Sequence, residues 1–287
     1  MPFWMISILI LLGLGIFFFS QIRGRKDNHV VQSKDALLTP EELEKHVREV
    51  AKTHTTSRNA GESNCLVDRM DQNFDLISSV YLMLNEDVKK KRSVPSAAEW
   101  LLDNFYIIEE QVKGIRQNLV KEKCRNLNIL TSGYLKGYPR IFALALELVS
   151  HSDGRLDEKT TTDFVTAYQS QNILSMTELW ALPIMLKMSL IENVKNVCEK
   201  IRVAQIEWRK VDDLKELDPD SIKVFILENT VSWNRASYSL VEHLLKSLRR
   251  QGAETKEILN YLDQKLLEFD LSVVRVVHEE HQEQANM

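Results

Sequence analysis

Residues 137–193 read GYPRIFALALELVSHSDGRLDEKTTTDFVTAYQSQNILSMTELWALPIMLKMSLIEN. The apolar spacing in this stretch predicts three consecutive helices, of which the first and the third are apolar nearly all the way round. A helix with apolar residues on every side is stable only when other elements cover it. We therefore expect the rest of the chain to pack around these helices.

Glu147 is the one charged residue within the apolar body of the first helix. A carboxylate buried in such a place requires a partner. Arg140, earlier in the same helix, and Arg155, in the following turn, are the candidates. We interpret Glu147 as one half of an internal ion pair rather than as a catalytic acid.

Capping signals mark where these helices begin. Pro139 suits the first turn of the first helix, and Asp157 is a plausible N-cap for the second. Ser175 and Glu178 form a capping box at the start of the third helix, which continues to about residue 209. Pro183 lies inside this helix, where it removes a backbone hydrogen bond and predicts a kink.

The composition is that of an ordinary globular protein rich in helices. The 287 residues are 44% hydrophobic, and only 9 glycines and 6 prolines are present, too few for a protein that needs frequent tight turns. The net charge of -4 offers no basic surface for nucleic acid. The three cysteines, Cys65, Cys124 and Cys198, have no metal-ligand spacing and indicate inert thiols in a reducing compartment.

The N-terminal segment predicts a membrane anchor. Residues 2–22 carry no charge, and as a helix they span about 30 Å, the thickness of a bilayer's hydrocarbon core. They lack the leading positive charge and the cleavage site of a signal peptide. Arg23, Arg25 and Lys26 follow at once and mark the cytoplasmic side. We expect a single-pass protein of the inner membrane, with its N-terminus outside and the bulk of the chain cytoplasmic.

After an anchor over residues 1–22 and a polar tether over 23–38, two membrane-proximal helices are expected within 39–94. The first begins with Thr39 as N-cap and runs to about residue 55, and the second carries an apolar stripe from Leu66 to Leu84. The basic run at 89–92 suits either contact with anionic lipid or a solvated helix end. We favour the solvated helix end.

Residues 95–287 are expected to form one helical module. A capping box at residues 96–99 begins a long helix, and residues 121–137 read as a polar connection to the central stretch. Four short helices are expected near 220–232, 237–250, 255–269 and 271–285. The predicted fold is all-α, with a transmembrane helix followed by a cytoplasmic bundle or array of helices.

The usual signatures of enzymes are missing from the sequence. It contains no glycine-rich phosphate loop, no nucleophile elbow and no paired acids in the context of a glycosidase. The histidines at 278 and 281 are three residues apart, not the four of a zinc-protease helix. We expect no catalytic, cofactor-binding or metal-binding residue in this chain.

Several motifs nevertheless resemble one family. GYPRIFALALELVSHSDGRLD, FVTAYQ and LSMTELWALPIMLKMSLIEN, in this order, are similar to the helical region near the N-terminus of bacterial cyclic β-1,2-glucan synthases. The resemblance covers about residues 98–287. It implies a place in front of a membrane glucosyltransferase domain that uses UDP-glucose, followed in the family by a cyclisation domain and a phosphorylase-like domain. None of these domains is in the present sequence, so we expect a fragment or a truncated product.

The resemblance transfers no catalytic residue. It marks positions that match the family motifs and whose roles the sequence does not disclose: Arg140, Glu147, His151, Asp153, Arg155, Glu178, Trp180, Glu192 and His281.

Three hypotheses follow for the function. The first is a non-catalytic region of a cyclic β-1,2-glucan synthase, bound to the bilayer through residues 2–22, that positions or docks the catalytic domains. The second is a stand-alone anchored scaffold that binds another protein. The third is an enzyme, for which Glu147, His151 and Arg155 form the one candidate cluster on the central helices.

Overall fold

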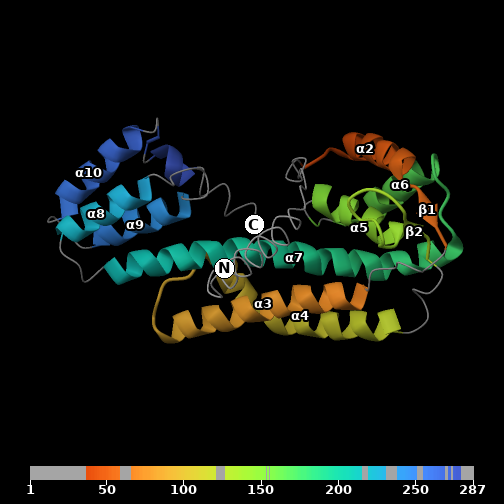
Figure 1. Ribbon diagram of the computed structural model, residues 1–287, viewed down its shortest axis with the longest axis horizontal. Coiled ribbons are helices and arrows are strands. Elements are labelled where there is room, and N and C mark those ends of the chain that lie inside the picture. Colours follow the sequence, from red (N-terminus) through yellow and green to blue (C-terminus); the bar gives the residue numbers. More distant parts are fainter. Residues whose placement is uncertain are drawn as a thin grey trace, which may run out of the picture.

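The computed structural model describes residues 37–58, 66–120, 127–152, 154, 156–214, 219–230, 238–250, 255–268, 271–272 and 274–278. Most of this part of the chain is helical, so the predicted all-α class is confirmed (Figure 1). The helices are α2 (Pro40–Thr53), α3 (Leu66–Lys89), α4 (Ser96–Val120), α5 (Arg140–His151), α6 (Glu158–Gln169), α7 (Met176–Asp213), α8 (Pro219–Thr230), α9 (Tyr238–Arg250) and α10 (Lys256–Leu267).

Helix α7 is the central element, because α3, α4, α5 and α9 all pack on it. Its 38 residues extend about 57 Å at the usual rise of an α-helix. The hairpin of α3 and α4 lies along it, while α5 packs on its N-terminal part and α9 on its C-terminal part (Figure 1). The expected capping box is present, because Ser175 caps the first turn and Glu178 bonds back to the Ser175 amide. The helix runs uninterrupted through Pro183.

The larger hydrophobic core surrounds α5, as the sequence predicts. Phe142, Leu144 and Leu148 of α5 are at most 1% exposed, and residues from α2, α3, α4, α6 and α7 complete the same cluster. The prediction that the third helix of the stretch is covered nearly all round is wrong at its N-terminal end. Met176 and Trp180 of α7 are 61% and 74% exposed.

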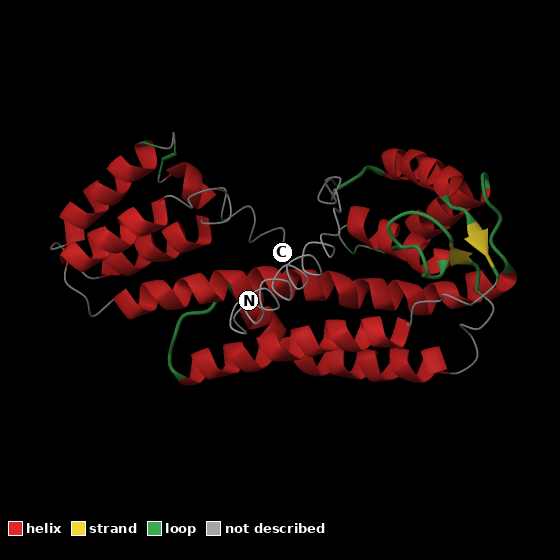
Figure 2. Cartoon of the chain, viewed as in Figure 1, coloured by secondary structure: helices red, strands yellow, loops and turns green. Residues whose placement is uncertain are grey.

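The connection before α5 is more ordered than predicted. Strand β1 (Thr56–Ser57) pairs antiparallel with β2 (Ile129–Leu130), at the same end of the fold as α5 and α6 (Figure 2). The chain then turns back on itself, and Gly137, with φ at +88°, donates to the carbonyl of Leu130. Such short strands leave no alternating pattern in the sequence, because backbone partners far along the chain define them.

A smaller core lies at the C-terminal end of α7. It joins Val211 and Leu214 to apolar residues of α8, α9 and α10, with Leu262 and Leu266 fully buried. The helices expected near 220–232, 237–250 and 255–269 are present with slightly shorter bounds. Of the fourth, residues 274–278 are helical, and its remainder lies mostly outside the described residues.

The basic run at 89–92 is a solvated helix end at its three lysines, as we favoured, but Arg92 is half-buried. Lys90 pairs with Glu86 on the surface, but Arg92 bonds Asp87, which is fully buried, and Asp213 at the end of α7. Arg92 therefore ties α3 to α7 rather than facing solvent alone.

The predicted anchor at residues 2–22 lies outside the described residues, as does the tether up to residue 36. Among the helices that the structure describes, none combines the length and the apolar character that crossing a bilayer requires.

Candidate functional site

Arg140 and Glu178 form a buried ion pair between α5 and α7. The guanidinium donates to both carboxylate oxygens of Glu178, at 2.6 and 2.8 Å, and also to the side chain of Asn172 and the carbonyl of Ile173. Arg140 is 4% and Glu178 is 0% exposed. Because Glu178 also closes the capping box with Ser175, this pair fixes where α7 starts relative to α5.

The ionisation of Glu178 follows from these contacts. Burial raises the pKa of its carboxyl, but hydrogen bonds from Arg140 and Ser175 outweigh burial and bring the pKa below its ordinary value of 4.5. Glu178 is therefore charged and fully paired at neutral pH, which makes it a structural residue.

Glu192 has a comparable role farther along α7. Arg69 of α3 donates to both of its carboxylate oxygens, and the Arg69 guanidinium lies over the ring of Tyr138, 5.0 Å from the centroid. Asn73 of α3 also reaches Glu192. These contacts hold α3 against α7.

Unlike Glu178 and Glu192, Trp180 of α7 takes part in no such ion pair, and its side chain faces solvent. It is 74% exposed, and Met176 and Ile173 beside it are 61% and 79% exposed. Met176 and Trp180 are four residues apart, so they share one face at the start of α7, and Ile173 lies in the loop just before the N-cap Ser175. We refer to Ile173, Met176 and Trp180 as the apolar patch.

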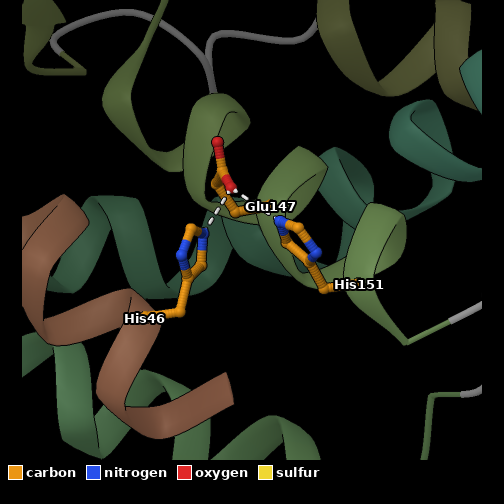
Figure 3. A group of neighbouring side chains, drawn as sticks. All are labelled: His46, Glu147 and His151. Carbon is orange, nitrogen blue, oxygen red and sulfur yellow. Dashed lines mark hydrogen bonds and ion pairs between the residues drawn. The ribbon is translucent and has the colours of Figure 1, made fainter. Parts of the chain in front are cut away.

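Glu147 joins two histidines in a cluster between α2 and α5 (Figure 3). The Nε2 atom of His46, from α2, lies 2.9 Å from Oε2 of Glu147. The Nε2 atom of His151, one turn beyond Glu147 on α5, lies 3.5 Å from the same oxygen. The two imidazole rings meet edge to face with their centroids 4.6 Å apart.

The two histidines control the charge of Glu147. Burial raises the pKa of its carboxyl, but the hydrogen bonds from His151 and His46 lower it more, to about 2. The expected ion pair between Glu147 and Arg140 is wrong, because Arg140 turns away toward Glu178. The other expected partner, Arg155, lies outside the described residues, as do Asp153 and His281.

In chemical terms the cluster offers three ligand atoms to a cation. The donor atoms of His46, Glu147 and His151 all lie within 4.8 Å of one another. His46 and Glu147 remain about one third exposed, and the side chain of His151 is 11% exposed. The cluster is thus reachable from solvent on one side and supported by the core on the other.

Sequence reasoning did not single out His46 or Arg69. His46 and Arg69 lie more than 100 residues before Glu147 and Glu192, the acids that they contact, and neither residue belongs to a sequence motif. The one local signal was the spacing of Glu147 and His151, four residues apart on a predicted helix.

Comparison with known proteins supports the resemblance drawn from the motifs. The chain is 28% identical over 204 residues to the cyclic β-(1,2)-glucan synthase NdvB of Rhizobium meliloti (strain 1021), in an alignment that covers 69% of this chain. The alignment spans about 7% of the length of that relative. No family model matches the chain. The similarity to a cyclic glucan synthase that the sequence motifs indicated is confirmed.

Proposed function

We propose that this chain is the non-catalytic, membrane-anchored N-terminal region of a cyclic β-1,2-glucan synthase, and that it docks the catalytic part of the synthase. The activity of the whole machine is then glucosyl transfer from UDP-glucose into cyclic β-1,2-glucan. The similarity to NdvB supports the link to such a synthase.

The exposed apolar patch is the observation that carries the docking role. Three large apolar side chains at 61–79% exposure, two on one face of α7 and one in the loop before it, are costly in water, and such patches mark interaction sites. Trp180 is also one of the positions that match the family motifs, and aromatic residues dominate the binding energy of interfaces. The occupant that we propose is the catalytic part of a cyclic β-1,2-glucan synthase.

Three of the other motif positions, Arg140, Glu178 and Glu192, support a scaffold rather than an enzyme. Arg140 pairs with Glu178, and Glu192 pairs with Arg69, so these charges hold α5, α7 and α3 together. A fully paired, buried charge has no free atom with which to bind a sugar nucleotide. We propose that these residues keep the start of α7 rigid, so that the apolar patch is presented in one orientation.

The anchor forms the second half of the proposal. Residues 2–22 are uncharged and long enough to cross a bilayer, and the basic residues at 23, 25 and 26 orient the following chain toward the cytoplasm. In this arrangement the helical region lies beside the inner membrane, where a membrane-embedded glucosyltransferase works.

The test is the production of cyclic β-1,2-glucan by cells that carry Trp180→Asp in place of the natural chain. Trp100→Asp is the matched control, because Trp100 is also the fifth residue of its helix, α4, and is 54% exposed. We expect Trp180→Asp to lower glucan output at unchanged chain abundance and Trp100→Asp to leave it unchanged. Equal output from both variants would remove the basis for docking through this patch.

The enzyme hypothesis has a separate test. Purified full-length chain incubated with UDP-glucose should release neither UDP nor glucan. Turnover that disappears in Glu147→Gln would overturn the non-catalytic assignment.

A further inference from the structure

The cluster of His46, Glu147 and His151 has the composition and the spacing of a metal site. Two imidazole nitrogens and one carboxylate oxygen converge on a small volume, and both nitrogens approach the same oxygen (Figure 3). Glu147 and His151 are four residues apart on α5, so the helix itself places them on one face. His46 closes the site from α2, 101 residues earlier in the chain.

The distances agree with tetrahedral zinc coordination. Zinc binds histidine nitrogen at about 2.0–2.1 Å and carboxylate oxygen at about 2.0–2.2 Å, so neighbouring ligands lie roughly 3.3–3.5 Å apart. The two nitrogen-to-oxygen distances here, 2.9 and 3.5 Å, bracket that separation. The two histidine nitrogens lie within 4.8 Å of each other, so the third pair of ligand atoms is also close, and an ion would draw these two nitrogens together.

We propose that His46, Glu147 and His151 bind one zinc ion, with the fourth coordination position open to water. The set of two histidines and one carboxylate suits a borderline cation, whereas calcium and magnesium prefer oxygen ligands alone. A structural zinc site commonly uses four protein ligands, while three ligands and an exposed position leave room for an exchangeable fourth. The proposal does not depend on the docking function.

The location gives the site a role in joining α2 to the core. Helix α2 packs chiefly on α6, and its direct contact with α5 is slight. A zinc ion held by His46 on one side and by Glu147 and His151 on the other would cross-link α2 and α5. Because a metal that binds the folded state stabilises it by mass action, zinc should raise the melting temperature of the chain.

The experiment is a zinc titration of the full-length chain, purified in detergent without an affinity tag and first stripped with a chelator. We expect one saturable zinc ion per chain by calorimetry and by elemental analysis. His46→Gln should weaken zinc binding by more than about 100-fold, because even loss of a group that only supports a ligand costs 10- to 100-fold. Glu49→Gln, which removes an exposed acid from the same helix, should leave zinc affinity unchanged.

His46 is a suitable position because its side chain is 34% exposed and its replacement leaves the core intact. A second measurement needs no variant: cobalt bound to the natural chain should give the intense visible absorption of a four-coordinate ion. Three results would each overturn the proposal. They are the absence of any saturable zinc site, a saturable site whose zinc affinity is unchanged in His46→Gln, and the weak absorption spectrum of six-coordinate cobalt. The cluster would then be a hydrogen-bonded tie between two helices.

Discussion

Replacing Arg140 with methionine should destabilise the larger core severely. The change leaves Glu178, which is 0% exposed, without its guanidinium partner, and it also removes the hydrogen bonds to Asn172 and to the carbonyl of Ile173. Breaking a buried ion pair by removing one partner costs about 3–5 kcal/mol. For a chain of this size each kcal/mol shifts the melting temperature by about 2–4 °C, so Arg140→Met should melt roughly 6–20 °C lower.

The assay is thermal unfolding followed by far-UV circular dichroism at neutral pH. Arg48→Met is the matched control, because Arg48 forms a half-exposed pair with Glu44 one turn away on α2. Pairs four residues apart on a helix surface contribute about 0.3–0.5 kcal/mol, so the control should melt within about 2 °C of the natural chain. If Arg140→Met melts no lower than Arg48→Met, the reasoning that this pair fixes α5 against α7 is refuted.

Three further predictions concern acid stability, a buried thiol and the anchor. Because the pKa of Glu178 is lower in the folded chain than its ordinary 4.5, its stabilising contribution is complete above that value and is lost as pH falls through the folded pKa. In denaturant titrations, the free energy of unfolding of Glu178→Gln should therefore fall less between about pH 5 and pH 2 than that of the natural chain. An identical pH dependence of the two chains would contradict this prediction. Burial raises the pKa of the Cys198 thiol to about 12, so this thiol should not react in the folded chain. In a variant with Cys65→Ser and Cys124→Ser, a thiol reagent should therefore label Cys198 only after unfolding. Rapid labelling of the folded variant would contradict the burial of Cys198. Removing residues 1–22 should move the chain from the membrane fraction to the supernatant, and continued membrane association would argue against the anchor.

The sequence predicted the helical class and most helix positions because those features depend on local chemistry. The caps formed by Thr39, Asp157 and Ser175 occur as expected, since a capping side chain bonds backbone groups two or three residues away. The apolar run of α5 likewise identified the centre of the core. Each of these signals is contained within one turn or one helix.

The partners of the charged residues were not predictable, because they depend on how distant helices meet. Arg140 and Glu147 lie two turns apart on one helix, which made them plausible partners, yet their side chains point to α7 and α2 respectively. The pairing of β1 with β2 depends in the same way on segments more than 70 residues apart. Periodicity reports which face of a helix is buried, and it does not report what covers that face.

Exposure of the apolar patch was the most informative departure from the sequence interpretation. The composition of α7 near residue 180 indicated a helix covered all round, but burial there is one-sided, so Met176 and Trp180 remain in solvent. An apolar residue in the sequence is equally consistent with a core position and with an interface. The three-dimensional arrangement separates these two cases and motivates the docking proposal.

The most direct test of the docking proposal is site-specific photo-cross-linking from position 180 in living cells, with position 100 as the control. Trp180 is replaced by a photoreactive phenylalanine analogue, and the cross-linked peptides are identified by mass spectrometry. We predict peptides from the catalytic part of a cyclic β-1,2-glucan synthase at position 180 and not at position 100. Cross-links only to unrelated proteins, or no excess over position 100, would contradict the proposed function.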